Sequence, residues 1–174
     1  MESKRITNRD FFTCEAEKLA EKLIGKIICH EVGEGKNKFV IKVRISVTEA
    51  YRKEDDCLDD NKTQKNTSQN LIGGHIHFHN ACEGRRRVDI VANFEGTPES
   101  VLIAGTDMYD GPSKTLWALD IDDAKYDGVD LIDPNSKIWL EDDGTKALIN
   151  PPIPRKNIKD QTPLRFSVAQ FTFR

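Results

Sequence analysis

The chain of 174 residues lacks the features that mark several large classes of protein. No stretch approaches the roughly 18–20 apolar residues that a membrane-spanning helix requires. Residues 1–12, MESKRITNRDFF, lack the apolar core of a secretory signal. The four cysteines form no C-x-x-C pair, so reduced thiols are the simplest interpretation. These absences predict an intracellular protein, located in the cytoplasm and on the nucleoid, or in the nucleus of a eukaryote.

An excess of positive charge is also missing. The sequence has 26 Lys and Arg against 29 Asp and Glu, a formal net charge of −3. Proteins that bind nucleic acid usually carry a surplus of cations. Any nucleic-acid contact is therefore expected at a local patch. The one dense cluster is Arg85, Arg86 and Arg87, which is either a solvated turn or a contact to phosphates or the minor groove.

Apolar spacing predicts a small set of helices and strands. The predicted strands span 26–32, 38–51, 75–79, 87–94, 100–105, 136–142 and 163–171, and the predicted helices span 14–24 and a segment beginning near Pro112. A long polar loop covers residues 52–70. We expect a single α+β domain over residues 1–174, with a mixed, mostly antiparallel curved sheet, peripheral helices and a protruding hairpin whose tip lies near residues 80–86.

The segment RISVTEAY, residues 44–51, combines an acid and a phenol. Residues two apart in a strand face the same side, so Glu49 and Tyr51 share one face. A glutamate at the end of a strand is usually exposed to solvent. The flanking Val47 and Ala50 favour partial burial instead, and a partly buried carboxylate can act as a general acid or base.

Four short stretches, taken together and in order, resemble the alkyladenine (3-methyladenine, methylpurine) DNA glycosylases. The four stretches are LAEKLIGKIICH (19–30), RISVTEAY (44–51), DGPSKTLWALDI (110–121) and PLRFSV (163–168). Each motif is short, but their order and spacing make the match specific. The resemblance extends from about residue 11 to residue 170.

The resemblance implies a role for each residue of the second motif. Glu49 is expected to activate a water that attacks the sugar carbon as the damaged base leaves, and Tyr51 to stack on the flipped base. His77 is expected to form the opposite wall, and the main-chain carbonyl of Val168 to help orient the water. Enzymes of this kind must extrude the base before they can reach its bond. A cationic alkylpurine also gains a cation–π interaction from a phenol ring. We therefore expect an open slot, sized for one purine, beside Tyr51.

The resemblance also implies partners and cofactors. Double-stranded DNA with a damaged purine is the expected partner, no metal or organic cofactor is required, and the protein is expected to be a monomer without a membrane contact. Arg85, Arg86, Arg87 and Lys114 are the expected DNA contacts. Lys114 precedes a predicted helix, where it either meets a phosphate or is an ordinary surface lysine.

Several positions differ from the family pattern. Asp60 stands where the family has a histidine that contacts the base, and the hairpin tip has no wedge tyrosine. Val91 and Ala104 fall near the family's asparagine and arginine. These differences leave open an alternative function, a catalytically weak relative that binds nucleic acid.

A third interpretation comes from HIHFHNAC, residues 75–82. His75, His77 and His79 share one face of a strand, and Cys82 follows, a spacing typical of zinc sites. The outer two histidines are about 13 Å apart at ~3.3 Å per residue, so one metal can take two neighbours but hardly all three. The cluster is therefore either the centre of a metal-dependent hydrolase, with His75 and His77 as ligands, or a set of histidines at the edge of a pocket.

Overall fold

The computed structural model describes residues 2–55, 70–81, 85–121 and 123–173. Its strands are β1 (Lys4–Arg5), β2 (Ile27–Val32), β3 (Phe39–Tyr51), β4 (Ile76–Ala81), β5 (Arg85–Ala92), β6 (Glu99–Thr106), β7 (Ile138–Asp142), β8 (Lys146–Ile149) and β9 (Arg165–Thr172). Its helices are α1 (Ala16–Leu23), α2 (Pro112–Ala118) and α3 (Asp123–Tyr126), with short 3-10 turns at Arg9–Phe11 and Gly35–Asn37. Within the described part of the chain, no helix has the length and apolar character needed to cross a membrane.

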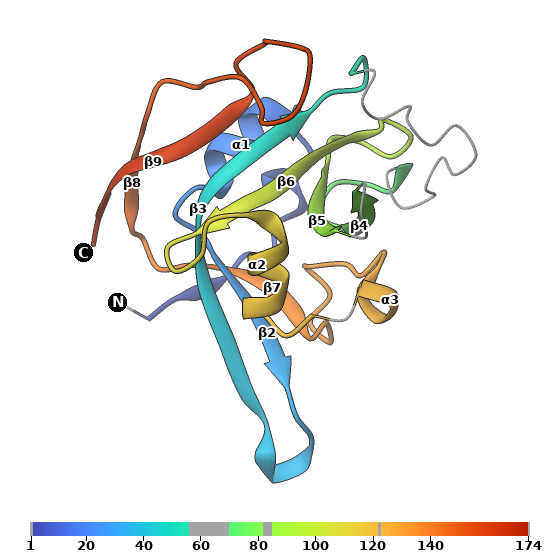
Figure 1. Ribbon diagram of the computed structural model, residues 1–174. Coiled ribbons are helices and arrows are strands. Elements are labelled where there is room, and N and C mark those ends of the chain that lie inside the picture. The colour runs from blue at the N-terminus through green and yellow to red at the C-terminus, as the bar shows by residue number, and fades with distance from the viewer. Residues whose placement is uncertain (1, 56–69, 82–84, 122, 174) are drawn as a thin grey trace.

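One curved sheet organises the molecule around β3 (Figure 1). The strand order is β1-β7-β2-β3-β6-β5-β4, and β9 joins the end of β3 with β8 on its outer side. Every pairing between these strands is antiparallel. The first half of β3 pairs with β2, and its last residues lie between β6 and β9.

An irregularity in β3 decides which residues form the core. Ile41, Val43 and Ile45 contact the main apolar cluster, and the register against β6 then shifts on either side of Val47. A shift of one residue exchanges the two faces of a strand. Beyond it, Ala50 faces the main cluster, while Val47 and Tyr51 contact a second, smaller cluster with Leu102 and Ala104. The shift thus turns the side chain of Tyr51 away from the core.

Helix α1 packs its apolar side against this core. Ala16, Leu19, Ala20 and Leu23 are buried, at the three- and four-residue spacing of one helical face. The hydroxyl of Thr48 on β3 donates a hydrogen bond of 3.0 Å to the carbonyl of Ala20. The helix is therefore fixed directly behind the end of β3.

The elements predicted from the sequence are confirmed, with small shifts at their ends. The α+β class and the mainly antiparallel curved sheet are also confirmed. Strands β4 and β5 form the expected hairpin, although its tip, 82–84, and most of the 52–70 loop lie outside the described residues. The β2–β3 hairpin, which was not expected to protrude, extends away from the body in Figure 1. Strands β1 and β8 and helix α3 were not predicted, because elements of two to four residues carry too little periodicity.

The pairing of β1 with β7 surrounds a buried acid, Glu141. Its carboxylate accepts hydrogen bonds from Lys42 Nζ at 2.6 Å and Trp139 Nε1 at 2.9 Å, and from the Ser3 hydroxyl. Burial by itself raises the pKa of Glu141, but the hydrogen bonds from Lys42, Ser3 and Trp139 outweigh it and lower the pKa to about 2. The ionised form is therefore strongly stabilised by folding.

This depressed pKa predicts a specific dependence of stability on pH. The stabilisation is complete above the ordinary pKa of 4.5 and is lost as the pH falls towards about 2. Glu141→Gln should lower the free energy of unfolding by up to about 3 kcal/mol at pH 7. Urea unfolding from pH 7 to pH 2 should show this difference shrinking below pH 4.5. A difference that stays constant with pH, or equals that of the exposed control Glu34→Gln, would contradict the assignment.

Candidate active site at the end of strand β3

Glu49 and Tyr51 lie together at the end of β3, as the sequence predicts. The two residues are only 3% and 4% exposed. The Tyr51 hydroxyl donates to Glu49 Oε2 at 3.1 Å, and Arg165 Nη1 and the backbone amide of Lys156 donate to Oε1, at 2.5 and 3.2 Å. Arg165 reaches Glu49 because the two residues are directly opposite in the β3–β9 register. A buried ion pair thus fixes the orientation of the carboxylate.

The environment of Tyr51 keeps its phenol protonated. Burial raises the pKa of Tyr51 far above its ordinary value, and the negative charges of Glu49 and Asp89 raise it further. Arg87 opposes this effect but does not outweigh it. The phenol is therefore a hydrogen-bond donor to Glu49 over the whole physiological pH range.

The face of the Tyr51 ring is covered by Arg155. The guanidinium carbon lies 4.9 Å from the ring centroid. Nη1 donates to the carbonyl of Ala50 at 2.9 Å and to Asp55 Oδ2 at 2.6 Å, and Nη2 donates to Asp160 Oδ2 at 3.1 Å. The expectation of an open slot beside Tyr51 is therefore wrong for this conformation, because the guanidinium of Arg155 occupies that space.

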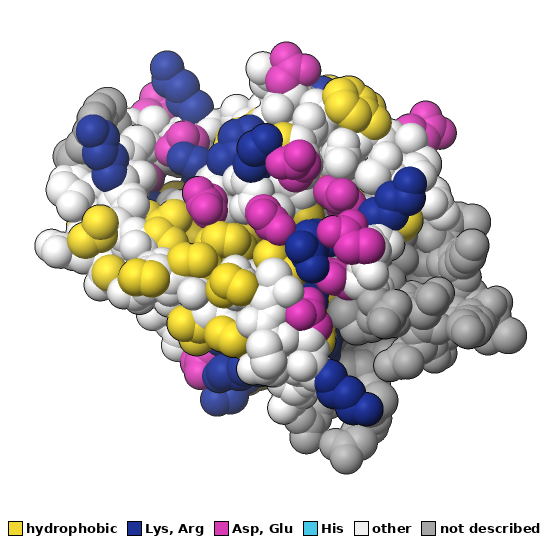
Figure 2. Space-filling model, turned by 90° about the horizontal axis from the view of Figure 1, so that it is seen from above, with side chains coloured by type: hydrophobic (Ala, Val, Ile, Leu, Met, Phe, Trp, Pro, Cys, Tyr) yellow, Lys and Arg dark blue, Asp and Glu magenta, His cyan; other side chains and the backbone are white. Residues whose placement is uncertain are grey.

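Arg155 comes from a segment of residues 151–163 that crosses the end of β3, the orange-to-red loop at the top of Figure 1. It is the one buried residue of that segment. Figure 2 looks down on this end of the molecule, where acidic and basic side chains intermingle beside an apolar band. A single buried guanidinium thus anchors an otherwise exposed segment over the site.

The carboxylate of Asp55 holds Arg155 from the other side. Burial alone raises the pKa of Asp55, but the hydrogen bonds from Arg155 and from the backbone amide of Arg52 lower it below its ordinary value. The Arg52 guanidinium also contacts Asp55 at 3.2 Å and Asp160 at 3.8 Å. Two arginines and two aspartates therefore form one network around the ring of Tyr51.

His77 is not the residue that faces Tyr51. The register places Glu49, Leu102, Asp89 and His77 side by side on β3, β6, β5 and β4. With strands ~4.8 Å apart, His77 lies about 14 Å from Glu49 along the sheet. It is fully buried, with Nδ1 3.4 Å from Asp127 Oδ1. Its predicted contact with a base is therefore not supported by its position.

The other predicted site residues differ in how they relate to Glu49 and Tyr51. Val168 is three residues beyond Arg165, and its carbonyl accepts from Asn150 Nδ2 at 3.2 Å. Lys114 is exposed on α2, whose Leu116 packs into the main core. Arg85 and Arg86 belong to β5, but their side chains, like all of Asp60, lie outside the described residues. Arg87 is partly exposed and acts electrostatically on Tyr51, so it is the member of the arginine cluster that the structure relates to the site.

Two arginines of the site, Arg155 and Arg165, were missed from the sequence. Ala104, at the position near the family's arginine, packs in the small cluster with Tyr51. Arg165 supplies the cation to Glu49 from a different strand. The signal for it was the PLRFSV motif itself, since an arginine within a predicted buried strand needs a partner. Arg155 in the Pro-rich stretch PPIPRK gave no such signal.

The histidine strand does not form a metal centre within the described residues, where no three His, Cys, Asp or Glu are grouped closely enough to hold an ion. The Nδ1 atom of His75 contacts the carbonyl of Ile72 at 2.7 Å, and its Nε2 lies 4.0 Å from Asp130. The side chain of His79 and all of Cys82 lie outside the described part of the chain. The described residues therefore provide no set of ligands that would support the hypothesis of a metal-dependent hydrolase.

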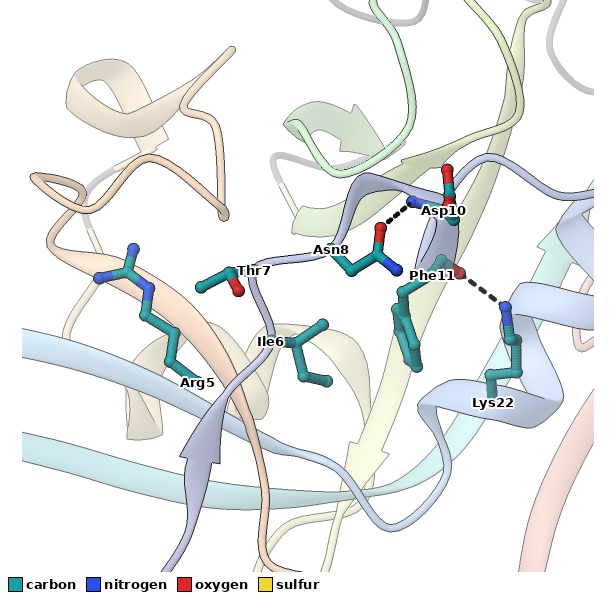
Figure 3. Close-up of a pocket in the computed structure, with 7 residues that line it drawn as sticks. All are labelled: Arg5, Ile6, Thr7, Asn8, Asp10, Phe11 and Lys22. Atoms are coloured by element: carbon teal, nitrogen blue, oxygen red, sulfur yellow. Dashed lines mark hydrogen bonds between the residues drawn. The ribbon is translucent and has the colours of Figure 1, made fainter.

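A separate cavity of about 490 Å³ lies near the N-terminus (Figure 3). It is lined by Arg5, Ile6, Thr7, Asn8, Asp10, Phe11 and Lys22. The Lys22 ammonium donates to the carbonyl of Phe11 at 2.9 Å, and Arg5 donates to the carbonyls of Leu131, Asp133 and Pro134. None of the predicted site residues lines this cavity.

Comparison with known proteins identifies the class. Residues 10–108 match the family described as methylpurine-DNA glycosylase (MPG), which is more than half of the chain. The chain belongs to this family of DNA glycosylases, which are hydrolases of N-glycosidic bonds. The match includes Glu49 and Tyr51 and ends before the segments that supply Arg155 and Arg165.

Three curated relatives share the name "Putative 3-methyladenine DNA glycosylase". The protein of Psychrobacter cryohalolentis is 28% identical over 162 residues, 76% of this chain and 75% of the relative. That of Prosthecochloris aestuarii is 34% identical over 106 residues, 59% of this chain and 50% of the relative. That of Chlorobaculum parvum is 28% identical over 157 residues, 76% of this chain and 71% of the relative.

The buried network predicts a large effect of removing one charge. Arg155→Met leaves Asp55 buried with one fewer cation and should lower the free energy of unfolding by about 3–5 kcal/mol. The double variant Asp55→Asn/Arg155→Met removes both charges and should recover most of this loss in urea unfolding. The half-buried pair Arg9–Asp130 provides the control, since Arg9→Met should cost only about 1 kcal/mol. A cost for Arg155→Met no greater than for Arg9→Met would contradict the prediction.

Proposed function

We propose that this protein removes alkylated or deaminated purines from duplex DNA by flipping the base and hydrolysing its N-glycosidic bond. The observation that carries the proposal is the buried carboxylate of Glu49, paired with Arg165 and next to the ring of Tyr51. Membership of the methylpurine-DNA glycosylase family and the names of the relatives support the same reaction. Duplex DNA with a damaged purine is the proposed partner.

Glu49 is the proposed general base. Its carboxylate accepts from Arg165, the Lys156 amide and Tyr51, and a carboxylate has about four acceptor sites, so one remains for a water. The water oxygen bonds to the anomeric carbon, the carbon–nitrogen bond breaks, and its electron pair leaves with the base. Glu49 takes the proton that the water loses. Arg165 keeps the carboxylate aimed at the sugar and acts as a positioning residue.

Tyr51 is the proposed stacking surface for the extruded base. Its ring is neutral and rigidly held, and aromatic faces bind bases by stacking. A base with a positive charge gains a cation–π interaction as well. The developing positive charge on the sugar is stabilised by the nearby anion Glu49. None of these steps uses a metal or an organic cofactor.

The proposal predicts the behaviour of a Glu49→Gln variant. The variant loses the proton acceptor and should cut lesion-containing duplexes at least about 100-fold more slowly. Abasic sites formed in duplexes with 3-methyladenine, 7-methylguanine or hypoxanthine provide the measurement. Glu34→Gln at the exposed hairpin is the matched control and should retain full activity.

Loss of the charge also leaves Arg165 buried without its anion, so the fold of Glu49→Gln has to be verified by circular dichroism and urea unfolding at the assay temperature. A folded variant as active as the wild type would refute the role of Glu49. Absence of lesion-dependent abasic sites in the wild type would refute the glycosylase reaction.

One observation favours a second candidate function. Because Arg155 covers Tyr51 and three donors already bind Glu49, the protein could recognise nucleic acid with little or no catalysis. Binding to damaged duplexes without cleavage would favour this candidate.

Either function requires contact with DNA phosphates. Replacing Arg85, Arg86 and Arg87 by alanine should reduce the slope of log affinity against log salt by about 0.9 for each phosphate that the protein no longer neutralises. The Lys36→Ala/Lys38→Ala variant of the β2–β3 hairpin, far along β3 from Glu49, is the control. Equal slopes in both variants would exclude the arginine cluster as the DNA contact.

A further inference from the structure

The guanidinium of Arg155 takes the volume that a flipped base requires. It lies 4.9 Å from the centroid of the Tyr51 ring, within the distance range of stacked groups. Tyr51 is 4% exposed, so its covered face cannot receive a purine while Arg155 remains there. If Tyr51 binds a base, as in the proposed function on which this inference rests, then Arg155 has to leave first.

We propose that Arg155 is a displaceable occupant of the base site, and that Asp55 and Asp160, which now hold its guanidinium, select positively charged bases once it has moved. In the present conformation, the site holds a planar cation, the guanidinium of Arg155, over the ring of Tyr51. Arg52 stays paired with Asp55 and Asp160 when Arg155 leaves. A planar cationic purine restores the second cation, whereas a neutral purine leaves the two carboxylates with one cation fewer.

The stretch of residues 154–157, which carries Arg155, can move while Asp160 stays in place. One end of this stretch is fixed, because Ile153 and Arg165 exchange two backbone hydrogen bonds of 2.9 and 3.0 Å. The other end is fixed by Ile158, which packs against the small cluster of Tyr51, and Asp160 is held beyond it by two hydrogen bonds from Thr162. Between these ends, residues 154–157 are exposed except for Arg155. Displacement of this stretch breaks few apolar contacts, and its main cost is the transfer of one guanidinium from its acceptors to water or DNA phosphate.

The same movement also frees the proposed general base. Lys156 follows Arg155 directly, and its amide donates to Glu49 Oε1. When this stretch shifts, the Lys156 donor leaves and a second acceptor position on Glu49 becomes available, so that a water can be held by both. The movement that lets a base reach Tyr51 therefore also releases Glu49 Oε1 from the Lys156 amide.

Two consequences can be measured separately. Expulsion of Arg155 costs the same for every base, so Arg155→Gln should tighten the binding of cationic and neutral bases by the same factor. Attraction by Asp55 and Asp160 differs between bases, so it appears only in the ratio of the two affinities. The charge-balanced double variant Asp55→Asn/Arg155→Gln covers the case in which Arg155→Gln alone does not fold.

The experiment measures equilibrium binding to duplexes whose target nucleotide carries a fluorinated, hydrolysis-resistant sugar. One duplex contains 7-methylguanine, which is cationic, and the other contains hypoxanthine, which is neutral. Arg155→Gln should bind both about tenfold more tightly. Asp160→Asn should lower the ratio of the two affinities about threefold, as expected of one partly exposed charge, and the double variant should lower it further. Asp120→Asn, an exposed change at the end of α2, should alter neither.

Each outcome decides a separate point. Unchanged or weaker binding by Arg155→Gln, in the folded single or double variant, overturns displacement. If the ratio of the affinities for 7-methylguanine and hypoxanthine is unchanged in both Asp160→Asn and the double variant, selection by the carboxylates is overturned. Equal binding of damaged and undamaged DNA by the wild type overturns it as well. Cleavage of ordinary lesion duplexes is assayed apart, so a protein that binds as expected but does not cut refutes the proposed function alone.

Discussion

The end of β3 buries a carboxylate and a phenol ring, and this is tolerated because two arginines from the last quarter of the chain cover them. Arg165 pairs with Glu49 across the β3–β9 register, and Arg155 lies on Tyr51 between Asp55 and Asp160. A buried charge without such a partner would cost several kcal/mol. The sheet register, the irregularity at Val47 and the path of residues 151–163 together bring these side chains into contact.

The arrangement joins a strand inside the family match to two arginines that lie beyond it. The family match covers residues 10–108, which contain Glu49 and Tyr51 but neither arginine. Ala104 on β6 cannot hold a carboxylate, and Arg165 approaches Glu49 from β9 instead. A cation thus reaches Glu49 from another strand. Since β3 lies between β6 and β9 at this point, a glutamate there can be oriented by an arginine from either neighbouring strand.

Local pattern was sufficient for much of the fold and for half of the site. The alternation in RISVTEAY placed Glu49 and Tyr51 on one face, and the spacing in α1 placed Leu19 and Leu23 in the core. His77 was expected opposite Tyr51, but lies three strands away, because sheet order is not encoded in the sequence of one strand. Arg155 could not be foreseen, since its role depends on how an irregular Pro-rich segment returns over β3. Short, unpatterned segments are positioned by long-range contacts.

The most direct measurement is a crystal structure of the protein bound to a duplex whose 7-methylguanine nucleotide resists hydrolysis. We expect the purine to stack on Tyr51 with Arg155 displaced. The Lys156 amide should no longer be bonded to Glu49, and Arg165 should still be paired with it. A flipped base bound elsewhere, with the guanidinium of Arg155 still on Tyr51, would show that Tyr51 is not the base site and that Arg155 is not displaced.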